Sequence, residues 1–192
     1  MQIICGSVDR VELDTAEVCR RLLVPRDFTL EKIDQCRSRL NGVMTCRYAW
    51  VRVPLSLPSN GTCVFDFAEV ESKDLYRNLY GCSEAFVFAV TLGMGVDRLL
   101  CRLNLLSQAE HFITDGLASA AAEALCDSVN ETIAHGLRVK PRFSPGYGDV
   151  PLSVQAPLLQ RLRAESTLGI TLNDAYLMTP VKSITAIAGI LP

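Results

Sequence analysis

Apolar residues recur every four positions over a long stretch in the second half of the chain. These residues are Ile113, Leu117, Ala121, Leu125, Val129 and Ile133. Residues with this spacing lie along one face of an α-helix and can be buried together. The pattern predicts a single helix from about Gln108 to Ala134, which His135-Gly136 can end.

A different pattern predicts the strands. Residues 84–93, EAFVFAVTLG, are almost continuously apolar and end in glycine, as in a strand that is covered on both faces. Residues 183–190, SITAIAGI, predict the last strand. The aromatic and β-branched residues of 46–55 and 62–67 lie on either side of the turn signal PSNG, and this order predicts a hairpin.

Shorter elements are predicted between these segments. The predicted helices are 29–41 with Thr29 as its cap, 72–79 with Ser72 as its cap, 96–106, and one after residue 150 with Ser153 as its cap. Two short strands are predicted at 170–172 and 175–178. Because hairpins and helices mix without regular βαβ alternation, we expect an α+β fold. It should contain a twisted, mainly antiparallel sheet packed with a long alanine-rich helix and several shorter helices.

Composition and charge narrow the class of protein. The 192 residues are 49% apolar and 21% charged, enough to build a core, and we expect a single domain over 1–192. Within it, 1–81 would form an N-terminal helix and hairpin portion and 82–192 the ligand-binding core. The net charge of -2, without any Lys/Arg-rich run, argues against nucleic-acid binding. We expect no secretory peptide and no membrane span, and therefore a cytoplasmic location.

Eight cysteines are scattered singly along the chain, and no two of them form a CxxC pair. The two histidines, His111 and His135, add no metal-binding spacing, so we predict no zinc or iron–sulfur site. In a reducing cytosol such thiols act as small buried apolar residues. A thiol-dependent redox or metal protein is the weakest functional hypothesis, because it depends on the number of cysteines alone.

Residues 142–149, RFSPGYGD, carry more functional groups than a turn needs. Their Pro-Gly pair fits the centre of a type II turn, in which glycine supplies the positive φ. Arg142 offers a planar fork of donors to a carboxylate or phosphate, Tyr147 offers an aromatic face, and the glycines let a flat ligand approach the backbone. The residues alone leave a second interpretation open, a structural turn in which Arg142 pairs with Asp149.

The alanine-rich stretch LASAAAEALC, residues 117–126, contains one charge, Glu123. By helical geometry this carboxylate lies away from the ridge that carries Leu117 and Leu125. It either marks the exposed face of the helix, the usual place for a glutamate, or enters an alanine-lined pocket where it can accept hydrogen bonds from hydroxyl or ammonium groups. The residues alone leave both interpretations open.

Four ordered segments together resemble a known family. Arg142, Gly146 and Tyr147 form an R-x-x-x-G-Y pattern that resembles the S-adenosylmethionine-binding motif of the reactivation domain of cobalamin-dependent methionine synthase. Three further segments resemble parts of that domain in the same order: FVFAVTLG (86–93), LASAAAEAL (117–125) and GITLNDAYLMTPVKSITA (169–186). The resemblance covers about residues 82 to 190 and is stronger still to short, free-standing relatives of that domain.

The resemblance implies a ligand and its contacts. Arg142 would bind the carboxylate of S-adenosylmethionine, and main-chain groups around Ser144 and Gly146 would recognise the adenine. Tyr147 would lie beside the ligand, toward the corrin, and Glu123 would lie at the same site. No residue is given a catalytic role. The family's acidic contact from the N-terminal portion has no secure counterpart, and its best candidate is Asp66 in VFDFAEV.

The activity implied by the resemblance is the repair of an oxidised cofactor. Such a domain presents the methyl group of S-adenosylmethionine to cob(II)alamin while a flavodoxin-like donor reduces the cobalt. The cobalamin is held by methionine synthase or by another corrinoid protein. The domain itself contributes positioning and electrostatics. The alternative is a non-catalytic module that binds a corrinoid protein and has lost S-adenosylmethionine binding.

Overall fold

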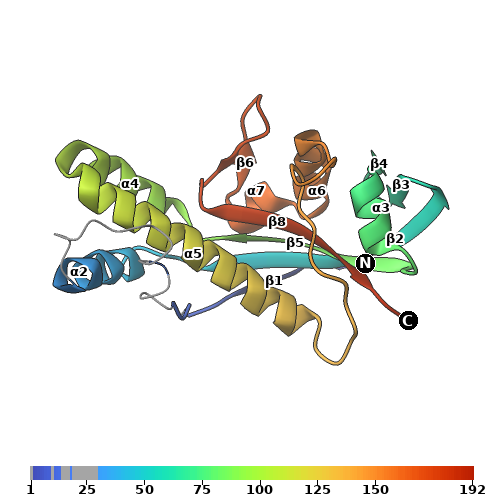
Figure 1. Cartoon of the computed structure of the whole chain (residues 1–192), viewed down its shortest axis with the longest axis horizontal. Helices are drawn as coiled ribbons and strands as arrows, with labels where there is room; N and C mark the ends of the chain where they lie inside the picture. Colours follow the sequence, from blue (N-terminus) through green and yellow to red (C-terminus); the bar gives the residue numbers. More distant parts are fainter. Residues whose placement is uncertain (1, 10, 14–17, 19–29) are drawn as a thin grey trace.

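A curled antiparallel sheet forms the centre of the structure, a computed structural model that describes residues 2–9, 11–13, 18 and 30–192 (Figure 1). Its strands are β1 (Ile4–Ser7), β2 (Arg47–Ser59), β3 (Thr62–Phe65), β4 (Glu69–Glu71), β5 (Glu84–Thr91) and β8 (Ser183–Ile190). The strand order is β4-β3-β2-β5-β8, and β1 pairs with the first residues of β2. Two short strands, β6 (Thr171–Leu172) and β7 (Met178–Thr179), form a separate hairpin.

Helices cover both faces of this sheet. On one face lie α2 (Leu30–Asn41), α4 (Met94–Leu106) and α5 (Gln108–Ile133). On the other lie α3 (Lys73–Leu79), α6 (Gln155–Arg161) and α7 (Ala164–Leu168), with the 3₁₀ turn η1 (Leu152–Val154) leading into α6. Alternate residues of β5 therefore enter different cores: Phe86, Phe88 and Val90 face α5, and Ala85, Val87 and Ala89 face α6 and α7. Burial on both faces explains why this strand is continuously apolar.

The long helix α5 crosses the sheet diagonally (Figure 1). All six residues of its predicted ridge are buried, so the predicted helix is confirmed over nearly its whole length. Ser107 caps its start by accepting a hydrogen bond from the backbone N–H of Glu110, and Gly136 beyond its end has a φ of 75°. The buried alanines of α5 share a core with Ala186 and Ala188 of β8, where small side chains on both elements permit close approach.

The predicted α+β class and the antiparallel sheet are confirmed, whereas two local predictions are wrong. Ser153 caps no helix: it lies inside η1, and α6 begins after Val154 without a side-chain cap. Residues 175–177 form no strand, because the side chain of Asn173 accepts hydrogen bonds from the backbone N–H groups of Ala175 and Leu177 and closes a turn. The cap at Ser72 is confirmed, while Thr29 lies outside the described residues.

Burial accounts for most of the described cysteines. Cys36, Cys46, Cys63, Cys82 and Cys126 are buried free thiols, and Cys5 and Cys101 are exposed free thiols. Burial raises the pKa of Cys126 to about 12 and that of Cys63 to about 11, so both stay protonated and behave as small apolar groups. Cys19 lies outside the described residues. Within the described residues, His, Cys, Asp and Glu form no cluster suited to a metal ion.

No helix within the described ranges combines the length and the apolar character that a membrane crossing requires.

Candidate functional site

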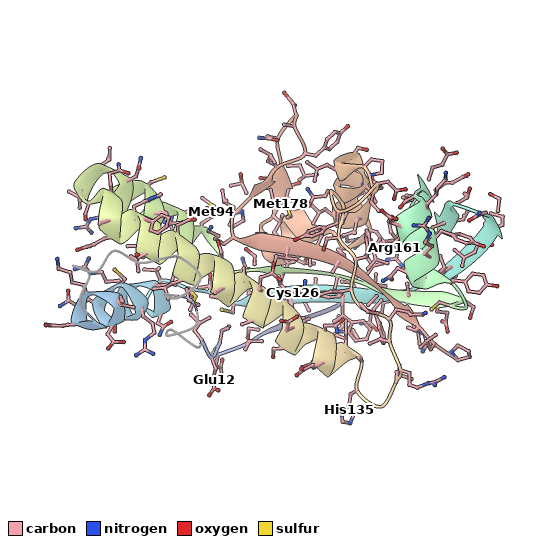
Figure 2. The ribbon with its side chains drawn as sticks, viewed as in Figure 1. Glu12, Met94, Cys126, His135, Arg161 and Met178 are labelled. Atoms are coloured by element: carbon pink, nitrogen blue, oxygen red, sulfur yellow. The ribbon has the colours of Figure 1, made fainter. Side chains whose placement is uncertain are left out.

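A cavity of about 400 Å³ lies where β8, α5, the 142–149 segment and the β6–β7 hairpin meet. Its size is within the range of small-molecule sites. The residues that line it are Glu123, Arg142, Phe143, Ser144, Pro145, Tyr147, Leu152, Gln155, Met178, Ser183, Ile184 and Thr185. Figure 2 places Met178 on the hairpin side of β8 and Cys126 on α5. The cavity therefore brings together Glu123, Arg142, Ser144 and Tyr147, four of the five residues predicted for ligand binding.

Backbone pairing along β8 places Arg142 at this cavity. Phe143 exchanges two backbone hydrogen bonds of 2.8 Å with Ile187, and the N–H of Lys140 donates to the carbonyl of Gly189 at 2.8 Å. Phe143 packs with the core on the α6 side of the sheet. Because neighbouring side chains of an extended segment point to opposite faces, Arg142 is directed toward α5.

The Pro-Gly turn of the motif has the predicted geometry. The N–H of Tyr147 donates to the carbonyl of Ser144 at 3.1 Å, and Gly146 adopts a φ of 87°. That positive φ is the one that a type II turn requires of its third residue. Gly146 is not among the residues that line the cavity; it shapes the loop instead, and its N–H donates to the carbonyl of Val150 at 3.0 Å. Tyr147 forms part of the rim, with 67% of its surface exposed.

Arg142 is held by two carboxylates of α5. Its Nη2 lies 2.7 Å from Oε2 of Glu123 and 2.8 Å from Oδ1 of Asp127, and its Nε donates to the same Asp127 oxygen at 3.2 Å. Burial of the guanidinium lowers its pKa, but the hydrogen bonds to Glu123 and Asp127 outweigh that effect and raise the pKa of Arg142 above its ordinary value. Arg142 is therefore a permanent cation, 23% exposed, between two acids that are more than half exposed.

Both interpretations of Glu123 are partly correct. Its side chain is 53% exposed, as expected for a glutamate on a helix surface, yet it also lines the cavity and contacts Arg142. Asp127, one helical turn further along α5, was missed at the sequence level. The i, i+4 spacing of the two acids is visible in the sequence, and it places them on the same side of the helix.

The possible ion pair between Arg142 and Asp149 does not form. The carboxylate of Asp149 instead caps α3, where it accepts hydrogen bonds from the hydroxyl of Ser72 and from the backbone N–H groups of Lys73 and Asp74. The end of the motif is thereby tied to the start of α3. The hydrogen bond from Ser72, opposed by desolvation and assisted by the two N–H groups, lowers the pKa of Asp149.

The cap at Asp149 predicts a pH-dependent contribution to stability. A carboxyl group whose pKa is lower in the folded state stabilises the fold above its unfolded pKa, and this contribution is lost as the pH falls through the folded pKa. We expect Asp149→Ala to lower Tm by roughly 2–5 °C at pH 7, and this difference from wild type should shrink below about pH 4. Thermal unfolding followed by circular dichroism between pH 3 and pH 7 measures it.

Asp174→Ala is the matched control, because that exposed acid makes no hydrogen bond or ion pair within the described part of the chain. Its effect on Tm should be small at every pH. A deficit in Asp149→Ala that stays constant from pH 7 to pH 3 would contradict the assignment of the carboxylate as the stabilising group.

The far wall of the cavity is connected through Gln155, which is 4% exposed. Its Nε2 donates to the carbonyl of Tyr176 at 2.7 Å, and its Oε1 accepts from the hydroxyl of Thr185 at 3.2 Å. One side chain of α6 thus joins the β6–β7 hairpin to β8. Sequence reasoning missed Gln155, because its partners lie in distant segments and carry no motif.

The loop before β8 is fastened to α4 and α5. Nζ of Lys182 lies 2.8 Å from Oδ1 of Asp115 and 2.9 Å from Oγ of Ser119, and Oδ1 of Asp97 accepts from the N–H of Val181 at 3.0 Å. Lys182 is therefore an ion-pair partner with only 11% of its side chain exposed.

Asp66, the candidate for an N-terminal acidic contact, is not brought to the cavity. Its Oδ2 accepts from Nε of Arg161 at 2.9 Å, which ties the segment after β3 to the end of α6. Figure 2 shows Arg161 on the side of α3, away from α5. The site as described thus receives its negative charges from α5.

Comparison with known proteins identifies the fold. No family model matches the sequence, and a search of curated proteins finds no match. The structure is similar to a solved structure described as the MetH reactivation domain bound to AdoHcy, with a TM-score of 0.71. The similarity covers 100% of this chain and 79% of that chain, at 13% sequence identity. The resemblance predicted from the motifs is confirmed at the level of the fold.

Proposed function

We propose that this chain binds S-adenosylmethionine in the cavity at β8 and that it supports reductive remethylation of a corrinoid held by a partner protein. The observation that carries the proposal is the convergence of Arg142, Glu123, Ser144 and Tyr147 on one cavity. The fold adds support, because the similar solved domain is described as bound to AdoHcy, the demethylated form of this ligand.

Each end of the ligand has a chemical counterpart in the cavity. The guanidinium of Arg142 suits the carboxylate of the amino-acid part, and the carboxylate of Glu123 suits its ammonium group. The N–H and hydroxyl of Ser144, which have no hydrogen-bond partner among the described residues, can address the edge of the adenine. The exposed ring of Tyr147 leaves the open side of the cavity for the methyl group and its acceptor.

The proposed reaction transfers a methyl group from the sulfonium of S-adenosylmethionine to the partner's corrinoid, and S-adenosylhomocysteine leaves as a neutral thioether. The starting cob(II)alamin needs one electron, which we assign to a flavodoxin-like donor. The partner is a cobalamin-dependent methionine synthase or a related corrinoid methyltransferase, and the location is the cytoplasm. This chain's part is to bind and orient the methyl donor.

Calorimetric titration of the purified chain tests the ligand. We expect S-adenosylhomocysteine and S-adenosylmethionine to bind with one-to-one stoichiometry and to raise Tm as their concentration rises. A titration without heat and without a Tm shift at millimolar ligand would overturn the proposal. A second assay, formation of methylcobalamin on a cob(II)alamin-loaded methionine synthase with and without this chain, tests the partner by absorbance.

One observation favours a second candidate, a corrinoid-protein-binding module that works without S-adenosylmethionine. Two acids already occupy Nη2 of Arg142, so a ligand carboxylate has to compete for that donor. This candidate predicts that the chain binds a corrinoid protein equally well with and without S-adenosylmethionine. The calorimetric titration separates the two.

A further inference from the structure

The two acids that hold Arg142 are not equivalent. Glu123 lines the cavity and reaches Nη2 alone, at 2.7 Å. Asp127 is not a lining residue, and its Oδ1 reaches both Nη2 at 2.8 Å and Nε at 3.2 Å. Asp127 therefore holds the Nε–Nη2 edge of the guanidinium, and Glu123 meets the same group from the cavity. Nη1 donates to no acceptor in the described part of the chain.

We infer that Asp127 is a positioning residue, which fixes the plane of the Arg142 guanidinium so that its Nη1–Nη2 edge is presented to the ligand's carboxylate. The inference rests on the proposed function. A planar guanidinium offers two edges for paired hydrogen bonds, and an acid on the Nε edge leaves the other edge available. Glu123 is then the exchangeable partner: a ligand carboxylate displaces it from Nη2, and it turns to the ligand's ammonium group.

This exchange keeps every charge in the site paired. Before binding, two carboxylates share one guanidinium. After binding, Arg142 lies between Asp127 and the ligand carboxylate, and Glu123 pairs with the ammonium. Without Asp127, Glu123 would be the remaining partner of Arg142, and the guanidinium would move with the Glu123 side chain. The ligand carboxylate would then have to compete with Glu123 for the whole guanidinium. Loss of Asp127 should therefore weaken binding of ligands that carry the carboxylate.

Asp127 contributes little to the stability of the fold. Its side chain is 64% exposed, and ion pairs at that exposure add little to stability. The two roles can therefore be separated, because a structural role would affect all ligands of the cavity alike. A positioning role affects those ligands that use Arg142.

Calorimetry with two ligands tests the inference. S-adenosylhomocysteine carries the amino-acid carboxylate, while 5′-methylthioadenosine keeps the adenine, ribose and thioether and lacks it. We expect Asp127→Leu to weaken the binding of S-adenosylhomocysteine by about 5- to 20-fold and the binding of methylthioadenosine by less than about 2-fold. Asp127→Asn should stay within about 3-fold of wild type, because its amide oxygen can accept the same two hydrogen bonds.

Two controls make the result specific. Glu131→Leu removes an exposed acid one turn further along α5 and should leave both affinities unchanged. In an Arg142→Ala background, Asp127→Leu should cause no further loss, because the residue acts through Arg142.

The outcomes separate the inference from the proposed function. If wild type binds S-adenosylhomocysteine and Asp127→Leu binds it equally well, the positioning role is wrong and the proposed function stands. Equal weakening of both ligands also overturns the positioning role, since Asp127 would then act on the fold of the site. If wild type binds neither S-adenosyl ligand, the proposed function itself fails, and the inference fails with it.

Discussion

Arg142→Ala is expected to weaken binding of S-adenosylhomocysteine by about 100-fold. The arginine is the cation that the cavity presents to a ligand carboxylate, and hydrogen bonds between charged groups contribute about 1.5–3 kcal/mol. At about 1.4 kcal/mol for each factor of ten in affinity, the loss of two such bonds at the lower end of that range corresponds to about two orders of magnitude. Arg142→Lys should recover part of the affinity, because the charge remains but the planar fork is lost.

Arg161→Ala provides the matched control for this prediction. Arg161 is similarly shielded, with 19% of its side chain exposed, and it pairs with a single acid, Asp66, outside the cavity. Its removal should affect thermal stability about as much as removal of Arg142, while ligand affinity stays unchanged. If Arg142→Ala binds S-adenosylhomocysteine as tightly as wild type does, the carboxylate contact lies elsewhere and the proposed orientation of the ligand is wrong.

The elements that the sequence predicts well are those with a long apolar pattern. α5 was found because its buried ridge repeats every four residues over 21 positions, from Ile113 to Ile133. β5 and β8 were found because burial on both faces removes polar residues from the strand. Such patterns record burial directly, so they survive in the sequence without knowledge of the partner segments.

The elements that the sequence missed are short and depend on distant neighbours. β4 has three residues, and it becomes a strand by pairing with β3. β1 has four residues, three of them exposed, and its register is set by Arg47 to Trp50 of β2. α7 follows Arg163, which adopts a left-handed φ of 50° that nothing in the local sequence signals. Pairing partners and such backbone turns come from tertiary contacts, which short patterns do not encode.

The candidate site divides in the same way. The Pro-Gly chemistry of residues 142–149 predicted the turn, because it is local, whereas the residues that line the cavity were predicted from the resemblance to the family's motif. The partners of the motif's charged residues were not predictable from spacing. Strand pairing with β8 turns Arg142 toward α5, while Asp149 reaches the start of α3, more than seventy residues earlier in the chain. Identifying an acid near an arginine in sequence therefore says little about their pairing.

Gln155→Leu is expected to lower the free energy of unfolding by about 1–3 kcal/mol and to weaken ligand binding as well. Leucine fills a similar volume but leaves the hydroxyl of Thr185 and the carbonyl of Tyr176 without their partner, and Thr185 is 2% exposed. The β6–β7 hairpin also loses its link to β8, and this hairpin carries Met178 into the cavity. Urea denaturation gives the stability, and calorimetry with S-adenosylhomocysteine gives an affinity loss of about 3- to 10-fold.

Gln160→Leu makes the same chemical change on the exposed surface of the same helix and should leave stability and affinity near wild type. Gln155→Glu adds a directional test. At neutral pH its carboxylate can accept from Thr185 but cannot donate to the carbonyl of Tyr176, so the variant should be at least as unstable as Gln155→Leu. Protonation of the glutamate restores a donor, and its stability relative to Gln155→Leu should therefore rise as the pH falls. A pH-independent difference between the two variants would mean that the hydrogen bond to the hairpin is not what Gln155 contributes.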